Sequence, residues 1–238
     1  MQIDFKMIVV PGQQALAKLA ELQQNTGVVP IILGNADETD ALFENIETSE
    51  ESLDELLART ELEDAQRWLA ARAEEAKAFA LEFGADDTDE EDEDEEDWGE
   101  GDFGGMPEDG SDARLSAHCN IMTGKPYEQV ALALVPAELA WQVPCHLRIG
   151  GWNECPDAPV HAALFRYWGE RYGAVPVCYT GDVIEMSVSR PPQTLEDALA
   201  LAQEQYLYCP DIVDQGTETV EALARSLLHS PVWYFWWD

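Results

Sequence analysis

The chain has 238 residues, 46% of them apolar, so it is long enough to bury a substantial hydrophobic core. Its formal net charge is −35 at pH 7, from 48 acidic and 13 basic residues. A surface this negative repels phosphate backbones, which argues against binding to DNA or RNA and favours a basic protein partner.

Three features indicate the compartment. The first ten residues, MQIDFKMIVV, lack the basic start, long apolar stretch and small-residue cleavage site of a secretory signal. No run of about 18 uncharged apolar residues occurs, so we expect no membrane-spanning helix. The five cysteines are scattered and include no CxxC pair, which is typical of a protein without a disulfide scaffold. We therefore expect a cytoplasmic protein with no membrane contact.

Residues 1–85 have the pattern of an N-terminal α/β portion. Gly12–Gln24 has helical leucine spacing, and Val28–Gly34 is a short apolar run typical of a buried strand. Thr60 and Glu63 have the form of a capping box, and an apolar stripe then runs to Phe83. This pattern predicts a long helix over residues 61–83 that packs on the body of the protein.

Residues 86–112 form an acidic, low-complexity stretch with 16 acidic residues and no Lys or Arg. Such a stretch buries too little apolar surface to offset the entropy of ordering, so we predict a disordered linker. Two interpretations of its role stay open. One is a solvated spacer, and the other is an acidic-aromatic arm, carrying Trp98 and Phe103, that grips a basic partner or imitates nucleic acid.

Residues 113–238 read as a mixed α/β domain. Gly181 and Asp182 form a hairpin signal between two apolar runs. The overall prediction is an α/β fold, a mixed β-sheet flanked by helices, with a long acidic disordered insertion. The predicted strands are Gln129–Val135, Cys145–Asn153 as far as its Gly-Gly turn, Ala174–Thr180, Val183–Ser189 and a terminal strand from Pro231. The predicted helices are Val160–Tyr172, ended by Gly173, Thr194–Tyr206 and one from Thr217 to His229.

The chain ends in PVWYFWWD, in which five of eight residues are aromatic. An unbroken aromatic run fits a strand that is covered on both faces. Because successive side chains of a strand point to opposite faces of the sheet, the aromatic residues should divide between two sides. Trp233, Phe235 and Trp237 share one side, and Tyr234 and Trp236 share the other.

Four long motifs of the C-terminal part occur together. They are GGWNECP (150–156), RYWGERYGA (166–174), SRPPQTLEDALALAQEQYLYCPDIVDQG (189–216) and WYFWWD (233–238). In this order they resemble the DUF4253 domain, a bacterial family of uncharacterised function, over residues 113–238. TGVVPIILG and RWLAARAEE resemble the leading region of the same proteins. Members of this family are similar to genes found around bacterial toxin–immunity loci. The resemblance therefore implies an immunity-like role.

The carboxylates in these motifs allow two interpretations. Two or more that converge can hold a hard cation such as Mg²⁺. Their spacing fits no known metal loop, however, and Asp and Glu also cap helices and turns. We predict no metal site and no cofactor. The carboxylates concerned are Asp182, Glu185, Glu204, Asp211 and Asp214.

The cysteines and histidines show no paired zinc spacing. A thiol–imidazole pair needs proximity that a sequence does not reveal, and buried packed thiols are the usual case. The residues concerned are His118, Cys119, Cys145, His146, Cys155, His161 and Cys209. The catalytic candidates for an enzyme are Asp182, Glu185, Cys209 and Asp211.

Polar and aromatic side chains of the motifs are the candidates for a binding site around the CPDIVDQG loop, residues 209–216. They are Trp152, Asn153, Glu204, Gln205, Tyr206, Asp211, Asp214, Gln215 and Trp237. We expect a non-enzymatic, immunity-like or regulatory domain that binds a basic protein, such as a toxin, through an acidic surface. The alternative is a metal- or thiol-dependent enzyme with its pocket at this loop.

Overall fold

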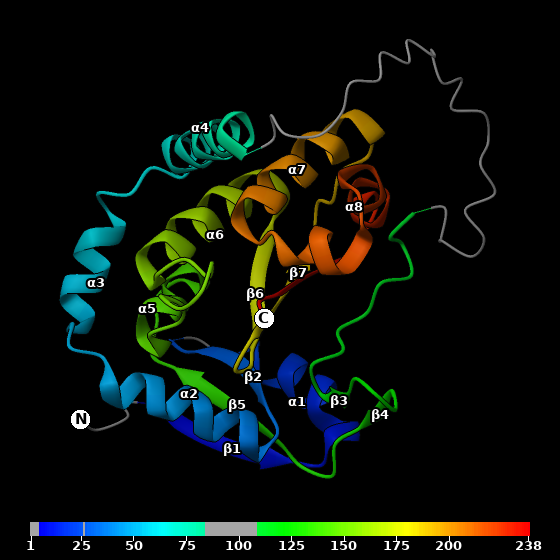
Figure 1. The fold of residues 1–238 in the computed structure, drawn as a ribbon. Helices are drawn as coiled ribbons and strands as arrows, with labels where there is room; N and C mark the ends of the chain where they lie inside the picture. The colour runs from blue at the N-terminus through cyan, green and yellow to red at the C-terminus, as the bar shows by residue number, and fades with distance from the viewer. Residues whose placement is uncertain (1–4, 26, 84–108) are drawn as a thin grey trace.

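The computed structural model describes residues 5–25, 27–83 and 109–238. Its centre is a six-stranded mixed sheet with the strand order β1-β5-β2-β6-β7-β8 (Figure 1). β2 and β6 pair in parallel, and the other neighbours pair antiparallel. The strands are β1 (Lys6–Val10), β2 (Val29–Gly34), β5 (Val130–Val135), β6 (Ala174–Tyr179), β7 (Val183–Val188) and β8 (Val232–Trp236). The N-terminal part thus supplies two strands, one on each side of β5, where the sequence pattern predicted one.

Helices cover both faces of this sheet, so the predicted fold class is confirmed. The larger core lies under α2, α6, α7 and α8, and the smaller core lies under α1 (Figure 1). Alternate residues of β2 enter the two cores, since Ile31 and Leu33 face the first and Ile32 the second. The helices are α1 (Ala15–Leu22), α2 (Ala36–Thr48), α3 (Leu53–Thr60), α4 (Ala65–Phe83), α5 (Val143–Leu147), α6 (Ala158–Tyr172), α7 (Leu195–Tyr208) and α8 (Val220–Leu227).

Shorter elements connect these helices and strands. They are the 3₁₀ turns Gly12–Gln14 and Ala140–Gln142, the π-helical turn Ile212–Thr217, and a small hairpin of β3 (Cys119–Asn120) and β4 (Lys125–Pro126). In the described part of the chain, no helix combines the length and the apolar character needed to cross a membrane. The predicted disordered insertion, residues 86–112, lies outside the described residues as far as position 108.

Helix α6 ends at Tyr172 as predicted, but it begins at Ala158, two residues before the predicted start at Val160. Asp157 caps its start, where the carboxylate accepts from the backbone N–H of Val160 at 3.4 Å. Gly173 ends it in the left-handed conformation, with φ of 62°. A Cβ at Gly173 would overlap the Ser189 side chain, so glycine is needed there for both backbone and space.

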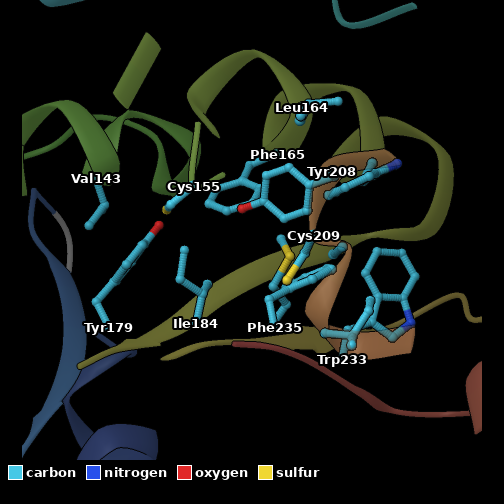
Figure 2. Packing of buried hydrophobic residues seen from close by; sticks show 14 of the residues in the cluster. Val143, Cys155, Leu164, Phe165, Tyr179, Ile184, Tyr208, Cys209, Trp233 and Phe235 are labelled. Carbon is cyan, nitrogen blue, oxygen red and sulfur yellow. The ribbon is translucent and has the colours of Figure 1, made fainter. Parts of the chain in front are cut away.

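The terminal strand β8 has the predicted alternation. Trp233, Phe235 and Trp237 are buried against α6 and α7, and Phe235 and Trp233 can be followed in Figure 2. The expectation that both faces are covered is wrong, because Tyr234 on the other side is 38% exposed. β8 lies at the edge of the sheet, and the core cluster of α1 on that second face includes residues of β2, β5 and β6 but none of β8.

Two local predictions were wrong. The segment Cys145–Asn153 is not a strand, because Val143–Leu147 forms α5, with Pro144 in its first turn. Thr60 does not start a helix: it is the last residue of α3, and its hydroxyl donates to the carbonyl of Leu56 at 3.0 Å. α4 begins instead after Asp64, whose carboxylate accepts from the Arg67 N–H at 2.8 Å.

Two further details, in α4 and α8, also differ from the prediction. In the apolar stripe of α4, Ala65 and Leu69 are buried, while Phe79 is 64% exposed. α8 is capped by Thr219, because Thr217 is the last residue of the π-helical turn that precedes it.

The burial of the β8 rings leads to a prediction about stability. Phe235→Ala should lower the free energy of unfolding by about 3–5 kcal/mol, since it removes a fully buried ring. Deletion of residues 233–238 should abolish cooperative unfolding. Tyr234→Ala is the matched control and should cost about 1 kcal/mol or less. Denaturant titrations measure all three, and equal costs for the Phe235 and Tyr234 variants would contradict this role of β8.

Candidate functional site

Several family-like motifs meet at one end of the sheet, and we call this place the motif junction. It is formed by the loop 148–157, the turn 180–183, the segment 209–217 and the last two residues. The Asn153 side-chain N–H donates to the carbonyl of Asp238 at 2.6 Å, and the Asp238 N–H donates to the Asp211 carboxylate at 3.0 Å. The Trp236 indole donates to the Asp182 carboxylate at 3.1 Å. Segments far apart in the sequence are therefore bound to one another here.

The loop of the junction has an unusual backbone. Four of its residues have positive φ, namely Arg148 (54°), Gly150 (87°), Gly151 (84°) and Asn153 (47°). A Cβ at Gly150 would overlap the carbonyl oxygen of Pro156, so the Gly-Gly pair lets the chain fold tightly over itself. Strained backbone of this kind is found where a segment is held in one fixed conformation.

Below the loop, three polar side chains form a buried row, which we call the Cys–His–Tyr row. The Cys155 thiol lies 3.4 Å from Nε2 of His161, and the Tyr208 hydroxyl lies 2.6 Å from Nδ1 of the same ring. His161 is completely buried, and Trp237 meets its ring edge-on at 5.7 Å. Figure 2 shows Cys155 and Tyr208 beside the ring of Phe165 in the aromatic core.

Burial keeps the Cys–His–Tyr row neutral. It lowers the pKa of His161 to about 3 and raises the pKa of the Cys155 thiol and of the Tyr208 hydroxyl. A nucleophilic cysteine needs a thiolate, usually beside an imidazolium. A neutral thiol and a neutral imidazole instead satisfy each other's hydrogen-bonding needs inside the core, which is a structural role.

A pocket lies beside the row. Its volume is about 10 Å³, which is the space of a single water molecule. The surrounding rings and loop residues therefore fill most of the junction. The pocket is lined by Leu42, Ile149, Gly150, Trp152, Cys155, Thr180, Gly181, Asp182, Val183, Ile184 and Trp237.

The structure assigns the four catalytic candidates to separate contacts. Asp182 lines the pocket and binds the Trp236 indole, and Asp211 binds the Asp238 N–H. The Cys209 thiol donates to the carbonyl of Trp236 at 3.0 Å, and burial raises its pKa to about 12. Within the described ranges, no three or more His, Cys, Asp or Glu residues gather in a way that would hold a metal ion.

Glu185, the fourth candidate, anchors the chain that returns after the acidic insertion. Its side chain faces the side of the sheet that carries α1 and is only 1% exposed. It accepts hydrogen bonds from the Ser116 N–H at 2.7 Å, the Ser116 hydroxyl at 2.6 Å and the Ala117 N–H at 3.0 Å. Three donors fully engage a buried carboxylate, so its place in the fold is explained by this anchor.

The binding candidates divide between the junction and other places. Trp152, Asn153, Asp211, Gln215 and Trp237 belong to the junction, where the Gln215 amide donates to the Asp211 carboxylate at 2.9 Å. Asp214 also belongs to the junction, and its carboxylate accepts from the Tyr206 hydroxyl of α7 at 2.9 Å. The other two lie elsewhere, since Gln205 is buried in the core and Glu204 lies between α6 and α7.

Glu204 explains two of the motifs structurally. Its carboxylate accepts from the Tyr167 hydroxyl at 3.0 Å, the Trp168 indole at 2.8 Å and the Arg171 guanidinium at 2.7 Å. The same guanidinium lies 4.9 Å from the ring centre of Tyr172. This network joins the RYWGERYGA helix to the following motif helix, so these polar residues hold α6 and α7 together.

Sequence reasoning missed the central residues of the junction. Cys155 and His161 appeared only among scattered thiols and imidazoles, and Tyr208 was not a candidate. Cys155 and His161 are six positions apart, one in the loop and one in the first turns of α6. The Tyr208 contact joins positions 47 apart, and neither spacing follows a recognisable motif.

The buried imidazole predicts a pH dependence of stability. The ordinary pKa of an unfolded histidine is about 6.5, and that of folded His161 is about 3, so the unfolded chain binds one more proton between these values. Stability should therefore fall as the pH falls below about 6.5. Between about pH 7 and pH 5, the wild type should lose about 2 kcal/mol more than His161→Gln in denaturant titrations. Parallel pH profiles of the two proteins would contradict a neutral buried His161.

The comparisons with known proteins agree with the motifs. Residues 131–238 match the family model described as "Domain of unknown function (DUF4253)". No curated protein and no solved structure matches the chain. The matched region contains β5 except Val130, β6 to β8 and the whole motif junction, while β1 and β2 precede it. The similarity to the DUF4253 family is thus confirmed over residues 131–238.

Proposed function

We propose that this protein is a non-enzymatic binding module that engages a basic protein partner through an acidic surface on α2 and α3. The charge density of this region carries the proposal. Residues 37–64 contain 12 acidic residues and one basic residue, Arg59. Arg59 is already paired with Glu51 at 2.8 Å and with Asp157. We define the α2–α3 acidic surface by five exposed carboxylates: Asp37, Asp40, Glu50, Asp54 and Glu55.

Folding accounts for only part of this charge. Glu38 and Glu55 complete capping boxes with Asn35 and Ser52 at the starts of α2 and α3. Acidic residues in a first helical turn also interact favourably with the helix dipole. Asp40 lies beyond the first turn of α2, and Glu50 precedes α3, so neither has that local role. Carboxylates this close repel one another, and a cationic partner would relieve the repulsion and be steered to the surface.

A suitable partner is a protein that itself binds a polyanion. A nuclease toxin, for example, needs clustered Lys and Arg to hold a phosphate backbone. An acidic surface that covers these cations would block the toxin without any catalytic step. This immunity-like role agrees with the toxin–immunity association that the family resemblance implies.

The enzymatic alternative has less support. Its best feature is the contact between Cys155 and His161 beside a pocket. Burial holds both groups in their neutral forms, and the pocket has space for one water molecule. These properties favour a structural role for the row.

Charge-neutralised variants test the binding proposal. Three tagged proteins are each purified from the native host at about 50 mM and about 500 mM salt. They are the wild type, the α2–α3 variant Asp40→Asn/Glu50→Gln/Asp54→Asn and the control variant Glu170→Gln/Glu196→Gln/Glu221→Gln. Both triple variants remove three exposed carboxylates. The wild type and the control should capture the same basic protein at low salt, and the α2–α3 variant should not.

High salt should release that partner, because the attraction is screened. The proposal fails if no basic protein is captured, or if the two triple variants capture it equally well.

A further inference from the structure

The two edges of the central sheet differ in how their backbone groups are satisfied. On β8, the Val188 N–H donates to the Pro231 carbonyl and the Trp237 N–H to the Asp182 carbonyl. By the alternation of an antiparallel ladder, the backbone groups of Val232, Tyr234 and Trp236 therefore face outward. The outward-facing backbone N–H and C=O groups of the edge strand β8 are therefore those of these three residues.

The protein's own side chains cover much of this β8 edge. The Ser230 hydroxyl donates to the Val232 carbonyl at 2.5 Å and accepts from the Val232 N–H at 3.3 Å. The Cys209 thiol donates to the Trp236 carbonyl. Natural proteins protect edge strands in such ways, because open edges pair with other chains.

β1 forms the other edge, and no side chain among the described residues forms a hydrogen bond with its backbone. In the part of the chain that the structure describes, no strand pairs with its outer side. Its register with β5 runs without a bulge from Lys6↔Leu134 to Val10↔Val130. Met7 and Val9 are 39% and 56% exposed, although both are apolar. Lys6 is the only charged residue in the strand, so β1 presents an open and largely apolar edge.

The distribution of charge along the chain also favours this segment as a contact between two copies. The whole chain carries a net charge of −35, yet residues 5–20 contain no acidic residue and two lysines, Lys6 and Lys18. Two molecules this negative repel each other wherever their acidic surfaces face. Like charges that lie opposite each other in a sheet are destabilising. Two copies that meet at an edge without acidic residues avoid this repulsion.

We propose that two copies of the protein form a dimer by antiparallel pairing of their β1 strands about a two-fold axis at Ile8. This register places Met7 opposite Val9 of the second copy and Ile8 opposite its own equivalent. All five residues of each strand are then paired, and the two sheets become one continuous sheet. The exposed apolar side chains of Met7 and Val9 cover each other across the new strand pair.

One pair of opposite charges fits this register. Lys6 lies opposite Val10 of the second copy. In each copy Val10 pairs with Val130, and Glu128 lies two residues before Val130. Each Lys6 therefore lies at the end of the interface where the other copy carries Glu128. The dimer does not depend on the proposed partner binding, because it uses β1 and not the α2–α3 acidic surface.

The first test compares oligomeric states by sedimentation equilibrium at about 100 μM. The wild type should be a dimer, and Met7→Glu/Val9→Glu should be a monomer, because it places carboxylates opposite each other. Leu62→Glu/Leu81→Glu is the matched control, since it adds the same charge at positions 84% and 81% exposed, and it should stay dimeric. A monomeric wild type, or a Met7→Glu/Val9→Glu variant that stays dimeric, would overturn the proposal.

The second test checks the register by cross-linking in a Cys119→Ser background, which removes the half-buried native thiol. Directly opposite residues have Cα atoms about 4.5–5.5 Å apart, within the reach of a disulfide. A mixture of Met7→Cys and Val9→Cys proteins should therefore form a disulfide-linked heterodimer on oxidation.

Each of these variants alone should not cross-link, because equivalent residues are offset along the strands by about 6.8 Å and lie beyond disulfide range. Cross-linking of either variant alone, without the heterodimer, would exclude the register centred on Ile8.

Discussion

Trp168 of α6 is the centre around which the C-terminal part is built. Its ring stacks on Phe235 of β8 at 5.8 Å with an interplanar angle of 5°, and it meets Tyr208 of α7 and Trp233 of β8 edge-on at 5.2 and 6.0 Å. Two of these contacts join α6 to β8, and the third joins α6 to α7. The ring of one residue therefore fixes the last strand against both helices, and buried aromatic pairs add to the large burial energy of the rings.

The motif junction depends on this packing. When β8 is held, its last residues reach Asp182, Asp211 and Asn153, and Trp237 covers the imidazole of His161. The family motifs therefore supply parts of one structural unit: rings for the core, a Gly-Gly turn over it and hydrogen bonds at its rim. Much of the acidity lies outside this unit. Residues 37–64 hold 12 acidic residues and residues 86–112 hold 16, and both segments precede the matched residues 131–238. The proposed binding surface and the motif junction therefore lie in different parts of the chain.

Sequence patterns predicted the elements whose signals are local. Gly173 marks the end of α6, and the alternating rings of β8 show its two sides. The pattern failed where short apolar runs fit either a helix or a strand, as in α5, and where a five-residue strand such as β1 has no turn signal of its own. The junction was only partly predictable, because the contact between His161 and Tyr208 depends on how α6 crosses α7.

Native-state hydrogen exchange tests the central role of β8 most directly. Trp233 and Phe235 direct their N–H groups toward β7, by the same alternation that turns Tyr234 outward. If the terminal strand is part of the central core, these two amides should exchange only through global unfolding, at the free energy found for the slowest amides of α6 and β6. Exchange of both amides through local fraying, far faster than that of α6, would contradict the account.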